Sequence, residues 1–178
     1  MSVLLAVAAL GAALVAGIFF TFSTFVMRAL ARLPSHEGIA AMQSINVVVL
    51  NPWFFAAFFG TGIVSLAAVA VAALGGDGLP VAITLGSALY LLGCIGVTIA
   101  GNVPLNERLA GHVPTGDDAE QVWRHYLSRW TLWNHVRPAA SLAAAAVLLA
   151  ARPEVRARGA NSLRSGSWAS SLRSSRAG

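Results

Sequence analysis

The sequence contains no lysine, a single cysteine and few charged residues. The shortages of cysteine and of charge each exclude a class of protein. With Cys94 alone, the chain can form neither an intramolecular disulfide nor a thiolate metal cluster. Only 11% of the residues are charged, 57% are hydrophobic and the mean hydropathy is +0.70, a composition that excludes an ordinary soluble domain. The net charge of +5 is due to twelve arginines, six of which follow Ala151, and this is not a nucleic-acid-binding pattern. We predict an integral membrane protein that binds no nucleic acid.

Long stretches without charge give the positions of the predicted membrane helices. No charged residue lies between Glu37 and Asp77, or between Asp77 and Glu107. A helix needs about 20 apolar residues to cross roughly 30 Å of hydrocarbon. Four stretches reach this length, namely residues 3–27, 47–74, 80–101 and 132–151. The first lacks the basic start of a secretory signal and is longer than the apolar core of one, so we expect it to remain as a helix.

The connections between these stretches define the predicted topology. The second and third spans are joined by GGDGLP, which is short enough only for a tight helical hairpin. The other two connections, residues 28–46 and 102–131, are long and polar, and in a four-span chain they lie on the same side of the membrane. We therefore predict an all-α four-helix transmembrane domain over residues 1–151, with polar connecting helices on one side.

The last part of the chain, residues 152–178, is rich in Ser, Arg and Gly and too poor in apolar residues to offset the entropy of ordering it. We predict a disordered tail there. The arginines near the spans are divided about evenly between the two sides, so the positive-inside rule gives little orientation. The three that directly follow the last span favour cytoplasmic termini, and they are Arg152, Arg156 and Arg158.

Strongly polar residues gather at the span ends that this topology places at one mouth of the bundle. They are Arg28, Asn46, Asn51, Asn102, Asn106, Glu107, Asn134, His135 and Arg137. Helix packing explains small residues in spans, but it does not require an asparagine or an arginine at every one of these ends. We therefore predict a polar pocket at this mouth.

Several of these residues also have a purely structural explanation. We expect Pro52 and Pro138 each to kink a helix and free a carbonyl in the preceding turn, and Asn51, Asn102 and Asn134 can donate hydrogen bonds to such carbonyls. An arginine within a span costs at least about 2.5–3.5 kcal/mol and usually faces a cavity or a partner. Arg137 could instead reach the headgroups or pair with Glu107, and Arg28 reaches the headgroups more easily. The tryptophans of the last connection and span are most simply membrane-interface anchors, and they are Trp123, Trp130 and Trp133.

Three segments together resemble a known family. They are NPWFFAAFFGTG at the start of the second span, GNVPLNERLA at the end of the third and WRHYLSRWTLWNHVRP leading into the fourth. The chain resembles the anthrone oxygenase-like family of small four-helix membrane proteins over residues 3–151. The resemblance implies a multi-pass protein of the bacterial plasma membrane. It also implies O₂-dependent oxidation of aromatic anthrone- or quinol-type molecules without a tightly bound cofactor or metal.

This activity would place specific demands on the polar mouth. An anthrone reacts with O₂ once it loses a proton activated by its carbonyl, so the site needs a base and a group that stabilises the enolate. We predict Arg137, Asn134 and Arg28 as the groups that face the enolate oxygen, and His135 as the base, with Glu107 as its alternative. The predicted substrate-binding residues are Asn51, Asn102, Asn106, Trp130, Tyr90 and Phe58.

Two other classes of function remain open from the sequence. A non-enzymatic protein could bind a lipid headgroup, a small anion or a partner subunit at the same mouth with the same residues. A haem or metal redox protein is less favoured, because only His135 lies within a span and no HExxH motif is present. The oligomeric state is not predicted.

Overall fold

The computed structural model of the chain describes residues 1–75 and 80–174, with side chains described up to Ala151. Its elements are α1 (Ser2–Thr21), the π-helical turn η1 (Phe22–Val26), α2 (Met27–Leu30), α3 (Ser35–Val48), α4 (Pro52–Leu74), α5 (Val81–Tyr90), the π-helical turns η2 (Leu91–Gly96) and η3 (Thr98–Asn102), α6 (Val103–Ala110) and α7 (Ala119–Ser174). These ranges contain no strand, so the predicted all-α fold is confirmed.

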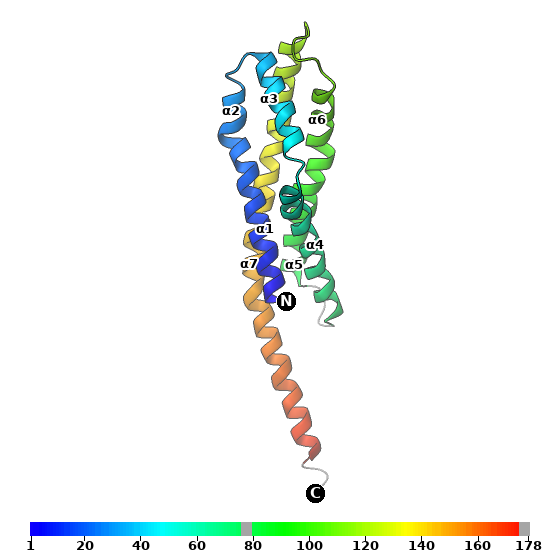
Figure 1. The fold of residues 1–178 in the computed structure, drawn as a ribbon. Coiled ribbons are helices and arrows are strands. Elements are labelled where there is room, and N and C mark those ends of the chain that lie inside the picture. Colours follow the sequence, from blue (N-terminus) through cyan, green and yellow to red (C-terminus); the bar gives the residue numbers. More distant parts are fainter. Residues whose placement is uncertain (76–79, 175–178) are drawn as a thin grey trace.

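Long helical rods run side by side in the structure (Figure 1). α1, η1 and α2 form the first rod, α4 the second, and α5 through α6 the third. α7 packs along α1 and α5, and α1 also packs on α4. Both long connections lie at one end of the rods, where α2, α3 and α6 are found (Figure 1). The predicted placement of these connections at a common end is therefore observed.

Three of the described helices are long and apolar enough to cross a membrane, and they are Ser2–Leu30, Pro52–Leu74 and Val81–Ala110. This is consistent with a multi-pass membrane protein. The predicted fourth span, residues 132–151, lies within α7 but does not appear among these candidates. Asn134, His135 and Arg137 lower the apolar character of its first turns. A count of four membrane spans is therefore not confirmed.

The end of α7 differs from the sequence expectation in one respect. Its backbone continues as a helix through Ser174, where no helix was predicted. Side chains after Ala151 lie outside the described residues, and so does the backbone of residues 175–178. The division into a transmembrane domain at 1–151 and a disordered tail at 152–178 stays a prediction.

The predicted second span, 47–74, is interrupted near its start. α3 ends at Val48, and α4 begins at Pro52. Between them, the Asn51 side chain accepts a hydrogen bond from the Phe54 backbone N–H at 3.0 Å and donates one to the Val48 carbonyl at 3.0 Å. Asn51 is thus a helix N-cap followed by proline at the first helical position, a common helix start. Pro52 begins a helix and does not kink one, which corrects the sequence interpretation.

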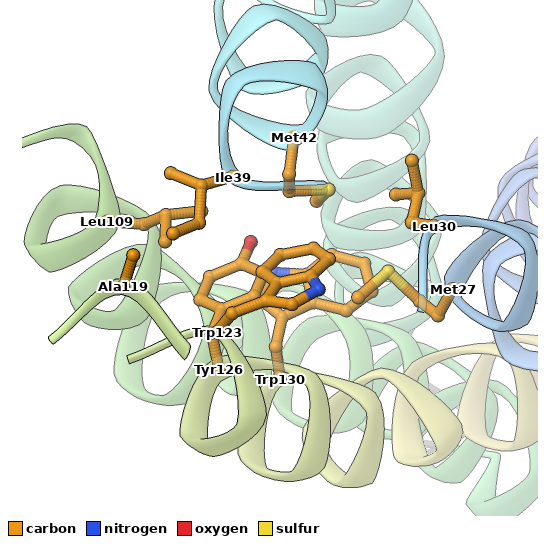
Figure 2. Packing of buried hydrophobic residues seen from close by; sticks show 9 residues of the cluster. All are labelled: Met27, Leu30, Ile39, Met42, Leu109, Ala119, Trp123, Tyr126 and Trp130. Carbon is orange, nitrogen blue, oxygen red and sulfur yellow. The ribbon is translucent and has the colours of Figure 1, made fainter. Parts of the chain in front are cut away.

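The connecting helices are held together by an aromatic stack on α7 (Figure 2). The rings of Trp123 and Tyr126 stack at 5.8 Å between centroids, and those of Tyr126 and Trp130 at 6.1 Å. Ile39 and Met42 of α3 cover this stack (Figure 2). Trp123 and Trp130 are buried, so they are core residues of this packing, in contrast to the membrane anchors expected from the sequence. Trp133 is 43% exposed and can still serve as an anchor.

Gly38 lets α3 lie directly on this stack. A Cβ at Gly38 would fall 2.6 Å from the Trp123 ring, which is fixed on both sides by packing. We expect Gly38→Ala to destabilise the protein by about 1–3 kcal/mol, the usual cost of overpacking. Gly17→Ala is the matched control, because its Cβ meets no atom within 4 Å. Thermal unfolding of the two purified variants tests this, and equal unfolding temperatures would contradict it.

Candidate functional site

A cavity of about 370 Å³ lies at the end of the rods where α2, α3 and α6 are found. Each rod contributes to it, as does α3. Its wall is mostly apolar, and Val47 and Leu50 on that wall are 72% and 62% exposed at the surface of the protein. Four of the sequence-predicted polar residues line the cavity, and they are Asn46, Asn106, Glu107 and Arg137.

Arg137 is the buried charge of this cavity, with 3% of its surface exposed. Its guanidinium lies over the Phe19 ring at 3.9 Å from the centroid and near the Trp130 ring at 5.0 Å. A desolvated cation over an aromatic face gains about 2 kcal/mol or more. Phe19 and Trp130 also line the cavity, so the cation is held at its wall by two aromatic rings.

Asn134 fixes the position of this guanidinium. Its side-chain oxygen accepts a hydrogen bond from Arg137 Nη2 at 2.6 Å. Its amide nitrogen donates to the Phe19 carbonyl at 2.9 Å and to the Ser23 hydroxyl at 2.7 Å. Both amide hydrogens are therefore used, and Asn134 is not free to donate to an enolate. This corrects its predicted role, since Asn134 positions Arg137 and does not itself line the cavity.

Among the residues with described side chains, no carboxylate lies within ion-pair distance of Arg137. The structural pair with Glu107 that the sequence left open is thus not formed. Arg137 Nη1 reaches the Thr98 hydroxyl at 3.4 Å, and its buried Nε has no partner in the described part of the chain. A buried charge usually has a counter-charge. Arg137 therefore retains capacity to bind an anionic or strongly polar group in the cavity.

Two π-helical turns contribute to this group, because Ser23 belongs to η1 and Thr98 belongs to η3. The Thr98 hydroxyl also donates to the carbonyl of Cys94 in a third such turn, η2, at 2.8 Å. π-helical turns occur frequently at functional sites, and here they occur in the two rods that contact Asn134 and Arg137.

Asn106 presents a second set of donors to the cavity. Its side-chain oxygen accepts from the Tyr126 hydroxyl and from Trp130 Nε1, both at 2.8 Å. The indole N–H can only donate, so the orientation of the Asn106 amide is fixed. Burial raises the pKa of the Tyr126 phenol, which therefore stays protonated and donates. In the described part of the chain the Asn106 amide nitrogen has no hydrogen-bond partner, and it remains available to a ligand.

Asn102 and Asn51 support the backbone and do not line the cavity. Asn102 is 1% exposed and donates to the Trp130 carbonyl at 3.1 Å, which ties η3 to α7. Asn51 caps α4. Asn51 also donates to the Val48 carbonyl that Pro52 frees, as the backbone-repair explanation holds, whereas Asn102 binds a carbonyl of another helix.

Two predicted aromatic residues also lie behind the cavity wall. The Tyr90 hydroxyl donates to the Phe58 carbonyl at 2.8 Å, and both residues are buried. The Phe58 ring packs edge-to-face on Phe19 and stacks on Phe54. Phe19 and Phe54 line the cavity, so Phe58 and Tyr90 contribute to its shape from the layer behind.

Two further predicted catalytic residues, His135 and Arg28, neither line this cavity nor contact Arg137. Both are exposed and line a separate open groove between α2 and α7. His135 is next to Asn134 in sequence, but a step of about 100° along a helix turns it to another face. The favoured base of the sequence analysis is thus separated from Arg137, whereas the alternative, Glu107, lies on the cavity wall.

Phe19, Ser23 and Thr98 were not predicted as site residues. A phenylalanine or a lone hydroxyl in an apolar span gives no signal by itself, because it usually packs or bonds to its own helix.

One comparison with known proteins finds a match. The sequence model of the anthrone oxygenase family matches residues 53–147, which is more than half of the chain. The chain therefore belongs to the anthrone oxygenase family. The matched range includes Asn106, Glu107, Asn134 and Arg137. No curated protein and no solved structure matches the chain.

Proposed function

We propose that the protein oxidises an anthrone- or quinol-type aromatic molecule with O₂ in the Arg137 cavity, without a resident cofactor. The observation that carries this proposal is a buried guanidinium, without a carboxylate partner among the described side chains, at the wall of an apolar cavity. Such a cavity suits flat hydrophobic rings, and the guanidinium suits an oxygen that becomes negatively charged during reaction. Family membership supports the same class of reaction.

The proposed reaction is balanced by O₂ alone. Anthrone loses a proton from the methylene carbon opposite its carbonyl, and the resulting enolate carries negative charge on the carbonyl oxygen. O₂ bonds to the deprotonated carbon and is reduced to a peroxide. Loss of water from this peroxide leaves a second carbonyl, so that one anthrone and one O₂ give one anthraquinone and one water.

Glu107 and Arg137 are suited to the two ends of such a molecule. Both residues line the cavity, and Glu107 is exposed to solvent whereas Arg137 is buried. In anthrone the methylene and the carbonyl lie at opposite positions of the central ring. Glu107 would take the methylene proton while Arg137 stabilises the enolate oxygen.

Asn106 and Trp130 complete the proposed binding surface. The Trp130 ring lies between Arg137, which approaches its face, and Asn106, which binds its Nε1. An aromatic ligand can stack near the indole with its oxygen atoms toward the guanidinium and the free amide of Asn106. Asn134 and Thr98 hold the guanidinium in place and are positioning residues.

O₂ uptake by the purified protein with anthrone tests the proposal. We expect consumption of one O₂ per anthraquinone formed, at a rate above the background oxidation at the same pH. We expect Glu107→Gln to lower this rate by about 10²-fold or more, the usual contribution of a general base. His135→Gln is the matched control and should keep the rate, because His135 does not line the cavity.

Two results would contradict the proposal. Equal loss in the Glu107 and His135 variants would remove the basis for choosing Glu107 as the base. Saturable binding of anthrone without O₂ uptake would assign the cavity to binding alone, as expected for a protein that holds a lipid headgroup, a small anion or a partner subunit there.

A further inference from the structure

A second concave surface lies on the outside of the molecule, between α2 and α7. This α2–α7 groove is open, has a volume of about 550 Å³ and shares no lining residue with the Arg137 cavity. The polar residues that line it are Arg28, Arg124, Ser128, Thr131 and His135. It is therefore a separate site, and the oxidation proposed above makes no use of it.

The α2–α7 groove is cationic. Arg28 and Arg124 bring two guanidinium groups to it from different helices, and His135 adds an imidazole. No carboxylate is among the residues that line it. Glu120 lies 3.7 Å from Arg124, but both side chains are more than 70% exposed, so this pair is weak. Ser128 and Thr131 place hydroxyl donors beside the cations.

The level of the α2–α7 groove along the rods also matters. Arg28 is the first charged side chain of the chain and follows the apolar run of α1 and η1. On the side of the groove toward the middle of the rods, Phe25, Leu132 and Val136 are 60%, 55% and 41% exposed. Along the rods, exposed apolar side chains thus give way to arginines. This is the order expected where the hydrocarbon region of a membrane meets the lipid headgroups.

We propose that the α2–α7 groove binds the headgroup of an anionic phospholipid. The phosphate would lie between Arg28 and Arg124, with the hydroxyls of Ser128 and Thr131 as further donors, while the acyl chains follow Leu132 and Val136 toward the hydrocarbon. Charge complementarity supports an anionic ligand. The adjoining apolar surface supports a lipid over a soluble anion, because a soluble anion has no acyl chains to contact it.

Native mass spectrometry of the full-length purified protein tests this site. Phosphatidylglycerol and phosphatidylcholine with identical acyl chains are added in separate titrations. We expect preferential binding of phosphatidylglycerol, and we expect the double variant Arg28→Gln, Arg124→Gln to weaken it about thirtyfold while leaving phosphatidylcholine unchanged. The double variant Arg32→Gln, Arg129→Gln removes the same charge from exposed positions outside the groove and should bind as the unaltered protein does.

Three results would overturn the proposal. Equal binding of the two lipids would show no anionic site, and equal weakening in both double variants would reduce the effect to net charge. Displacement of phosphatidylglycerol by glycerol phosphate would assign the groove to a soluble anion. Thermal unfolding of each variant confirms that it is folded, and its O₂ uptake with anthrone reports separately on the Arg137 cavity.

Discussion

Arg137→Met is expected to lower the rate of O₂ uptake with anthrone by about 10²–10³-fold, the usual cost of losing a group that stabilises an oxyanion. The same change should alter the stability little, because two effects oppose each other. It leaves the buried Asn134 oxygen without its donor, which costs about 1–3 kcal/mol, and it removes a buried charge. Among the described side chains Arg137 has no carboxylate partner, and its Nε has no hydrogen bond, so the desolvation cost of the charge is poorly offset. A methionine can occupy the space against Phe19 and Trp130 without that cost.

This combination separates a functional arginine from a structural one. Initial rates and thermal unfolding are measured on the same preparation, with Arg137→Lys as the comparison. Lysine keeps the charge but cannot make the same fork of hydrogen bonds to Asn134 and Thr98, so we expect only a partial recovery of rate. A variant Arg137→Met that oxidises anthrone normally, or one that unfolds, would contradict the assignment.

Asn134→Leu, in contrast to Arg137→Met, is expected to lower the stability of the protein strongly. Asn134 satisfies three groups at once, namely the buried Arg137 guanidinium, the buried Phe19 carbonyl and the partly buried Ser23 hydroxyl. Leucine would leave all three without this partner, and each buried group left unsatisfied costs about 1–3 kcal/mol. We expect a loss of about 2–4 kcal/mol, because some of these groups can find other partners.

The double variant Asn134→Leu, Arg137→Met gives the decisive comparison. With the guanidinium removed, the leucine leaves fewer polar groups without partners, and the double variant should be more stable than Asn134→Leu alone. A thermodynamic cycle from thermal unfolding of the four proteins measures this coupling. Simple additivity of the two changes would show that Asn134 does not act through Arg137.

The inward face of α7 could be predicted from the sequence. Helical periodicity groups Trp130, Asn134, Arg137 and Ser141, and all four are buried. His135 falls off that face, so the same periodicity argues against it as a base. His135 is predicted as the base because it is next to Asn134 in sequence. On a helix, however, adjacent residues point in different directions, and residues three or four apart share a face.

The polar face of the first rod does not turn toward other helices along its whole length. Gly17, Thr21, Thr24 and Arg28 lie close together by helical periodicity, and of these Gly17 and Arg28 are exposed. The threonine hydroxyls donate to carbonyls of their own helix, Thr21 to Ile18 at 2.7 Å and Thr24 to Phe20 at 2.8 Å. A hydroxyl satisfied in this way needs no partner and can face lipid. Phe19 and Phe22 line the cavity instead.

The end of α3 and the π-helical turns could not be predicted. Val47 to Leu50 are as apolar as the span that follows, and only Asn51 and Pro52 mark the new helix start. The π-helical turns lie within continuous apolar rods and depend on contacts between helices far apart in sequence, such as Asn134 with Ser23. A π-helical turn adds a residue to the helix, and this rotates all later side chains about the helix axis. Positions assigned with a constant 100° per residue are therefore wrong after such a turn.

The exposed apolar residues on the cavity wall determine how a ligand arrives. Val47 and Leu50 belong both to the cavity wall and to the outer surface of the protein, so apolar side chains connect the two. The proposed aromatic substrate would enter along these side chains from the bilayer without crossing water. Occupancy is then governed by the mole fraction of the compound in lipid, and a sparingly water-soluble compound can still saturate the protein.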